Sequence, residues 1–168
     1  MAYALDANVF IEAARRYYAF NICPGYWQSL IHQHTQRQIF SIDRVKEEMA
    51  GKGDELAPWV ADQVPDACFE SSDTAEIAAA YAELVAWVNA NAQFSAAAKA
   101  EFADEPDAWL IAYAKATEKT VVTHEAFIPE VQRRVPIPNV CRAFDAPYID
   151  TFEMLRALGL AYHWNAPA

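Results

Sequence analysis

The sequence is poor in cysteine, and no long uninterrupted apolar segment occurs in it. Its cysteines, Cys23, Cys68 and Cys141, lie far apart and form no Cys-x-x-Cys pair, which argues against a zinc site and against a disulfide framework. A reducing compartment, the cytoplasm, is therefore expected. Charges interrupt every apolar stretch well before the roughly 18 residues of a membrane span, and the first residues lack the basic and apolar regions of a secretory signal. We expect no membrane association.

Basic residues are also scarce, with 13 Lys and Arg against 23 Asp and Glu and a net charge of −10. Phosphate binding is driven largely by Lys and Arg, so this balance is unfavourable for a protein that binds nucleic acid. Arg15-Arg16 and Arg133-Arg134 are adjacent pairs that could form local basic patches. An acidic surface can also serve solubility alone.

The length of 168 residues and the hydrophobic content of 54% predict one domain with a sizeable core, covering 1–161 and followed by a flexible tail over 162–168. Short apolar segments predict strands at 2–5, 39–42, 67–69, 120–123 and 139–141. Apolar periodicity predicts helices at 7–18, 24–34, from 43 to the glycines at 51 and 53, and at 54–63, 72–88, 95–102, 107–117 and 148–160. This alternation predicts an α/β fold whose parallel sheet has helices on both faces.

Four acidic residues stand in distinctive positions of this pattern. Asp6 follows the first strand, Glu125 follows the strand at 120–123, Asp107 opens an apolar helix, and Glu48 lies near the end of the helix from Asp43. Sites in such folds form at the carboxyl ends of strands, so these carboxylates can converge there. Converging carboxylates repel one another unless a cation neutralises them, and oxygen ligands suit Mg²⁺ or Mn²⁺.

A divalent ion held there would lower the pKa of water and stabilise charge on a phosphate. Asn8 and Thr123 are expected to support the carboxylates or a metal-bound water, and no Ser-His-Asp or Cys-His arrangement is evident. The pattern therefore indicates metal-dependent phosphodiester chemistry.

Each of these residues also has a purely structural interpretation. Asp6 and Asp107 can cap helices, and Glu125 can be an exposed loop acid. Glu48 can be a solvated helix charge, with Glu47 as its rival for the site. Candidate contacts with substrate, each equally explained as surface charge or a capping group, are Arg15, Arg16 and His124.

Four motifs in order resemble those of PIN-domain ribonucleases, the family that includes VapC-type toxins. They are LDANVFI at 5–11, VKEEM at 45–49, DAWLIAYA at 107–114 and VVTHE at 121–125, and NVCRAF at 139–144 is consistent with a last strand. Each motif is weak alone, and four at plausible spacing are fairly specific. The chain is longer than the shortest of these toxins, and it has Glu125 where the family usually has Asp.

The resemblance implies a three-layer α/β/α sandwich, a Mg²⁺ or Mn²⁺ cofactor, hydrolysis of RNA, homodimer formation and inhibition by an antitoxin protein. The motifs match a less studied PIN-like subfamily best. We therefore predict a metal-dependent endoribonuclease, the toxin of a toxin–antitoxin pair, in which the metal ligands and catalytic residues are Asp6, Glu48, Asp107 and Glu125. Two alternatives stay open: a PIN-like scaffold module without catalysis, favoured by Glu125 and the acidic charge, and a structure-specific DNA nuclease.

Overall fold

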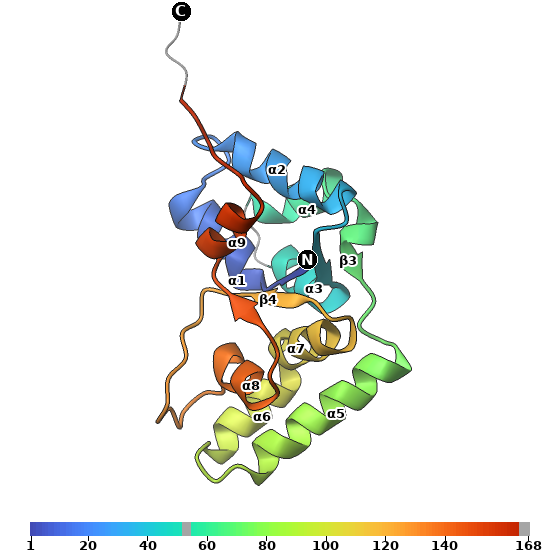
Figure 1. Ribbon diagram of the computed structural model, residues 1–168, viewed down its shortest axis with the longest axis vertical. Helices are drawn as coiled ribbons and strands as arrows, with labels where there is room; N and C mark the ends of the chain where they lie inside the picture. Colours follow the sequence, from blue (N-terminus) through green and yellow to red (C-terminus); the bar gives the residue numbers. More distant parts are fainter. Residues whose placement is uncertain (52–54, 165–168) are drawn as a thin grey trace, which may run out of the picture.

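A five-stranded sheet runs through the middle of the computed structural model, which describes residues 1–51 and 55–164 (Figure 1). The strand order is β3-β2-β1-β4-β5, and every neighbouring pair is parallel. The strands are β1 (Tyr3–Leu5), β2 (Ile39–Ile42), β3 (Phe69–Glu70), β4 (Thr120–Val122) and β5 (Tyr148–Ile149). β1, β2 and β4 are completely buried, as expected for the interior of a parallel sheet.

Helices cover both faces of this sheet. Figure 1 shows α2 (Pro24–Thr35), α4 (Leu56–Asp62) and α9 (Thr151–Ala157) on one side, and α5 (Ala75–Ala90), α6 (Ala96–Asp104) and α8 (Ile137–Ala143) on the other. α7 (Pro106–Ala116) packs directly on β1, β2 and β4. The remaining helical elements are α1 (Ala7–Glu12), the π-helical turn η1 (Ala13–Tyr17), α3 (Asp43–Ala50) and the 3₁₀ turn η2 (Asp66–Cys68). The predicted α/β/α sandwich with a parallel sheet is confirmed.

The central position of β1 creates the switch point of the topology. From β1 the chain proceeds to β2 and β3 on one side, and it then returns to place β4 and β5 on the other side. Leu5 is in register with Val122, so the residues that follow β1 and β4 leave the sheet side by side. The backbone N–H of Asp6 donates to the carbonyl of Val122 at 3.0 Å. In α/β folds, binding sites form at such a switch point, at the carboxyl ends of the strands.

Two predicted elements near the C-terminal end are wrong. The predicted strand 139–141 lies in helix α8, and the start of the predicted helix 148–160 is strand β5. Pro136 and Pro138 supply backbone angles suited to a helix start, which outweighs the strand propensity of the short apolar run. The last helix begins only at Thr151, where Asp150 and Glu153 form a capping box.

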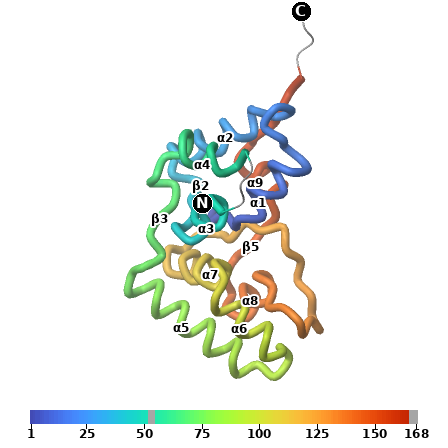
Figure 2. Tube along the Cα trace, turned by 180° about the vertical axis from the view of Figure 1, so that it is seen from behind, coloured from blue at the N-terminus to red at the C-terminus, as the bar shows by residue number. Residues whose placement is uncertain are grey.

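The segment after α9 returns along the first part of the chain (Figure 2). Within the predicted tail, the hydroxyl groups of Tyr162 and Ser29 are 2.8 Å apart. The residues 165–168 of that tail, and Gly53 of the predicted helix break, lie outside the described residues. Within residues 1–51 and 55–164, none of the helices combines the length and the apolar character of a membrane span.

A partly buried polar network ties α3 to the chain that precedes α5. The Asp43 carboxylate accepts hydrogen bonds from the Ser72 hydroxyl at 2.6 Å and from the Ser72 and Arg44 backbone amides at 3.2 and 2.9 Å. The Arg44 guanidinium lies 4.2 Å from the centroid of the Trp109 ring in α7. Since α3 carries Glu48 and α7 carries Asp107, this network helps to fix the distance between two of the four predicted site residues.

Replacing Ser72 with alanine should lower the free energy of unfolding by about 1–3 kcal/mol, because the Asp43 carboxylate loses a buried donor while its charge remains. Ser72 is fully buried. Urea denaturation measures the effect. The exposed neighbour Ser71 provides the matched control, and Ser71→Ala should change stability by less than about 0.5 kcal/mol. Equal effects of the two substitutions would contradict the role of the network.

Candidate functional site

The four predicted acids line one hollow at the switch point of the sheet. Asp6 follows β1, Glu125 follows β4, Asp107 is in the first turn of α7, and Glu48 comes from α3. The hollow has a volume of about 360 Å³ and is also lined by Asn8, Glu105 and Pro106. Glu47, the rival of Glu48, is exposed and does not line this hollow. The tertiary structure thus brings together residues separated by more than a hundred positions.

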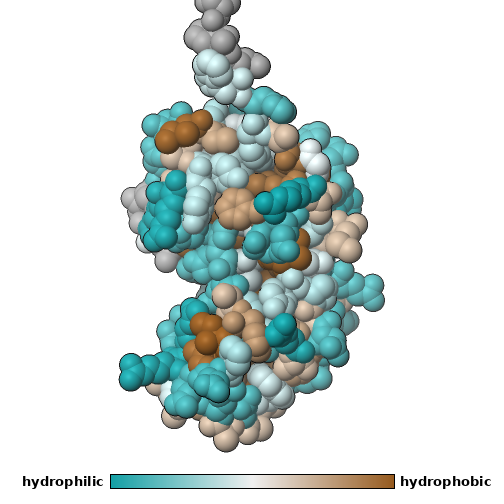
Figure 3. Space-filling model, turned by 60° about the vertical axis from the view of Figure 1, so that its left-hand side comes forward, coloured by the Kyte–Doolittle hydropathy of each residue, from teal (hydrophilic) through white to brown (hydrophobic). Residues whose placement is uncertain are grey.

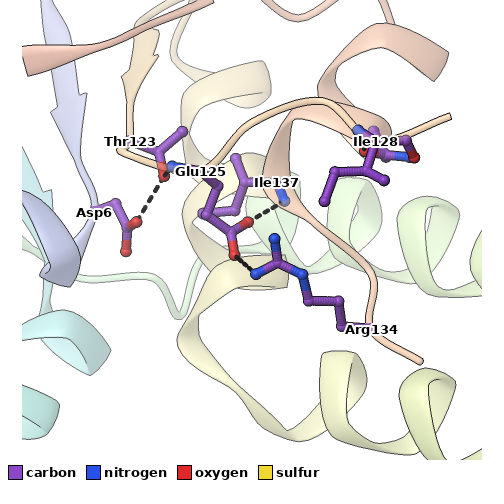
Figure 4. A network of polar contacts seen from close by, with 7 residues as sticks. Asp6, Thr123, Glu125, Ile128, Arg134 and Ile137 are labelled. Atoms are coloured by element: carbon purple, nitrogen blue, oxygen red, sulfur yellow. Dashed lines mark hydrogen bonds and ion pairs between the residues drawn. The ribbon is translucent and has the colours of Figure 1, made fainter. Parts of the chain in front are cut away.

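Asp6 is held by a relay of hydrogen bonds through Thr123 (Figure 4). The Thr123 hydroxyl donates to Oδ2 of Asp6 at 2.8 Å and accepts the backbone N–H of Glu125 at 3.1 Å. Both Asp6 and Thr123 are almost completely buried. Asp6 is the residue that precedes α1, and its carboxylate lines the hollow. Thr123 therefore orients this carboxylate.

Glu125 faces a cation and a backbone donor. Its Oε1 lies 3.1 Å from Nη1 of Arg134, and its Oε2 accepts the backbone N–H of Ile137 at 2.7 Å (Figure 4). Only 15% of the Glu125 side chain is exposed, against 50% of the Arg134 side chain. Glu is one methylene longer than the Asp that is usual at this position in the PIN-domain ribonucleases. This length allows the Glu125 carboxylate to reach the start of α8.

Burial and mutual repulsion perturb the acids of the hollow. Burial raises the pKa of Asp6 to about 7, and the charges of Glu125 and Glu48 add to this, while the Thr123 hydrogen bond opposes it. Burial also raises the pKa of Asp107 to about 9, reinforced by Asp6 and by other neighbouring carboxylates. The pKa of Glu105 is raised by the same two causes. The fold therefore brings the Asp6 and Asp107 carboxyl groups together in a place where ionisation of both is unfavourable.

The donor set fits a hard divalent cation in kind, because every candidate ligand is a carboxylate oxygen. A cation would also remove the repulsion that raises the pKa of Asp6 and of Asp107. Across residues 1–51 and 55–164, however, no three Asp, Glu, His or Cys side chains are already grouped as a metal site. Ion binding therefore requires side-chain adjustment, and Glu125, now engaged by Arg134 and Ile137, is one group that must move if it is to ligate.

The three residues predicted to contact substrate do not all lie at the site. Arg16 and His124 line a second hollow next to the first, whereas Arg15 is on neither lining among the described residues. Two residues of the site were not among the predicted site residues. They are Glu105, which lines the first hollow, and Arg134, whose position next to Arg133 in the sequence suggests only a local basic patch. No local signal ties Arg134 to Glu125, because the intervening segment has no regular structure before α8.

Comparison with known proteins finds one family and a structural likeness. A family described as a domain of unknown function (DUF4411) matches residues 3–162. The chain is also similar to the crystal structure of FitAcB from Neisseria gonorrhoeae, with 16% identity and a TM-score of 0.52, over 88% of this chain and 96% of that chain. At this identity the likeness shows the fold, which agrees with the α/β/α sandwich expected from the PIN-like resemblance. No curated protein matches the chain.

Proposed function

The chain belongs to the DUF4411 family, and we propose that this member is a Mg²⁺- or Mn²⁺-dependent endoribonuclease that acts as the toxin of a toxin–antitoxin pair. One observation carries the catalytic part: Asp6, Glu48, Asp107 and Glu125 converge on a single hollow at the carboxyl ends of β1 and β4. The order of the PIN-like motifs supports RNA as substrate and an antitoxin as partner. The homodimer that the resemblance implies is part of the same proposal.

The chain's own residues would bind and orient the reactants. Asp6, Glu48 and Asp107 would hold the cation, and Glu125 would join them or remain with Arg134. When bound, the ion supplies Lewis-acid chemistry, lowering the pKa of water and stabilising negative charge on the phosphate. Thr123 keeps the Asp6 carboxylate in one orientation through its hydroxyl. Because the pKa values of Asp6 and Asp107 are raised, binding of the ion releases protons and should strengthen as the pH rises.

The direct test is incubation of single-stranded RNA with the purified protein in Mg²⁺, in Mn²⁺ and in EDTA. We expect internal cleavage that leaves 5′-phosphate and 3′-hydroxyl ends, and no cleavage in EDTA. A folded protein that cuts no RNA in either metal would favour the scaffold alternative. Preferential cleavage of branched DNA over RNA would favour the DNA nuclease. Either result overturns the proposed activity.

The toxin role has its own test. Induced expression should arrest growth of a bacterial host, and the catalytic variant Asp107→Asn should not. Growth arrest that persists in the variant would separate toxicity from the carboxylate hollow. Light scattering of the purified protein measures the proposed homodimer independently of activity.

Replacing Thr123 with valine should weaken Mn²⁺ binding about 10- to 100-fold, because outer-shell hydrogen bonds to metal ligands contribute about that much. Valine keeps the shape and removes the hydroxyl that donates to Asp6. Titration calorimetry measures the change. Thr123→Ser keeps the hydroxyl and should retain most of the affinity. If Thr123→Val binds Mn²⁺ as the wild type does, the relay has no part in metal binding.

A further inference from the structure

A second hollow, of about 470 Å³, adjoins the carboxylate hollow and shares Asn8 and Glu125 with it. Its other walls come from Glu12 of α1, from η1 and from the segments that follow β4 and precede α8. These walls carry two guanidinium groups and two aromatic rings, from Arg16, Arg134, Tyr17 and His124. Figure 3 brings forward the side of the molecule that is on the left in Figure 1 and shows small hydrophobic areas set among hydrophilic side chains.

Tyr17 presents an exposed ring whose orientation is fixed by its neighbours. Its exposed fraction is 52%. The ring centroid lies 5.7 Å from that of Phe152 in an edge-to-face contact, and 6.2 Å from that of His124. The His124 ring is itself anchored, with Nε2 3.0 Å from the hydroxyl of Thr151. An aromatic ring held in place but open to solvent is a platform on which a base can stack. Tyr17 also ends a π-helical turn, a feature frequent at functional sites.

The two guanidinium groups of this hollow keep donors available. Nε of Arg16 pairs with Glu12 at 3.1 Å, and Nη1 of Arg134 pairs with Glu125 at 3.1 Å. Each guanidinium carries five N–H donors, so one ion pair uses only part of it. The side chains of Arg16 and Arg134 are 68% and 50% exposed. The hollow is also lined by Glu12 and Glu125, so its two arginines balance two carboxylates in a chain of net charge −10.

We propose that this second hollow binds the nucleotide next to the scissile phosphate of single-stranded RNA. The base stacks on Tyr17, and Arg16 and Arg134 contact the flanking phosphate groups. The volume is within the ~300–1,000 Å³ typical of ligand pockets and accommodates one nucleotide. The shared residues Asn8 and Glu125 make the path from this hollow to the carboxylates continuous. This inference rests on the proposed function and names the way in which that site would hold its substrate.

Fluorescence anisotropy with a short labelled single-stranded RNA, in EDTA and in Ca²⁺ over a series of salt concentrations, tests the assignment. Tyr17→Ala should bind roughly five- to a hundredfold more weakly, as expected for loss of one base stack, with an unchanged salt dependence. Tyr17→Phe keeps the ring and should recover most of the loss. Arg16→Gln should lower the slope of log affinity against log salt by about 0.7, the value for one phosphate contact on a single strand.

Arg133→Gln is the matched control for charge. It removes the same charge from an exposed arginine that lies outside the lining of the hollow, and it should leave the salt slope less changed than Arg16→Gln does. Thermal melting checks that every variant is folded. A wild type that binds no RNA in either buffer overturns the assignment. So does RNA binding that is the same in the wild type, Tyr17→Ala and Arg16→Gln, the outcome expected if this surface serves a protein partner instead.

Cleavage assays in Mn²⁺ separate the two proposals. If the wild type cleaves RNA and both variants cleave it with unchanged KM, the nucleotide assignment fails and the proposed activity stands. If RNA binding depends on Tyr17 and Arg16 but the wild type cuts nothing, the nucleotide site stands and the proposed activity fails. We expect KM to rise in both variants by the factor lost in binding, with a smaller change in kcat.

Discussion

The Asp107→Asn variant is expected to lose metal-dependent RNA cleavage by more than about a hundredfold, since loss of an outer-shell partner of a metal ligand already costs 10- to 100-fold. Asparagine keeps the size of the side chain and removes the negative charge. Asp107 stands in the first turn of α7 and faces Asp6 and Glu125 across the hollow. Single-turnover cleavage of a labelled RNA at saturating Mn²⁺ measures the loss. Asp6→Asn should behave in the same way.

Two exposed neighbours provide matched controls for this experiment. Asp104→Asn makes the same chemical change three residues earlier, and Glu47→Gln makes the corresponding change beside Glu48. Both side chains lie outside the lining of the carboxylate hollow, and their variants should cleave as the wild type does. Glu48→Gln should instead lose activity. Retention of full activity by Asp107→Asn would remove the carboxylate hollow from the mechanism.

Without divalent cations, Asp107→Asn should be more stable than the wild type, and the difference should grow as the pH rises. The pKa of Asp107 is raised from 3.8 to about 9, so the folded protein keeps a proton that the unfolded chain releases. The stability contributed by this group is therefore complete below pH 3.8 and is lost as the pH rises through about 9. The slope is at most about 1.4 kcal/mol per pH unit for one proton. Asparagine does not ionise, so the variant escapes this loss.

A divalent cation should reverse the order near pH 5, where the raised pKa of Asp107 costs the wild type less than about 2 kcal/mol, and should narrow the difference near pH 8. At a free ion concentration about 100 times the Kd, the wild type gains about 2.7 kcal/mol, whereas the variant, with a damaged site, gains little. Urea denaturation near pH 5 and near pH 8, each with and without Mg²⁺, measures both effects. Asp104→Asn again serves as the exposed control. A wild type that is equally stable with and without the ion at both pH values would contradict metal binding by these carboxylates.

Much of the architecture could be predicted from local patterns. The short buried strands β1, β2 and β4 are apolar runs of the expected length, and the helices between them carry regular apolar spacing. The alternation of these elements leads to a parallel sheet with covered faces. The C-terminal region is different, because proline preferences at α8 and a capping box before α9 override the apolar pattern there. Boundaries of this kind depend on backbone geometry more than on hydrophobicity.

Neighbouring residues were enough to predict the α/β class and the acidic residues that end strands or open helices, because these features are local. Three contacts became known from the folded chain alone: Thr123 donates to Asp6, Glu48 rather than Glu47 enters the hollow, and Arg134 engages Glu125. These contacts join segments far apart in the chain or depend on which face of a helix is turned inward. The raised pKa values of Asp6 and Asp107 have the same origin, since they come from burial and from charges that folding brings together.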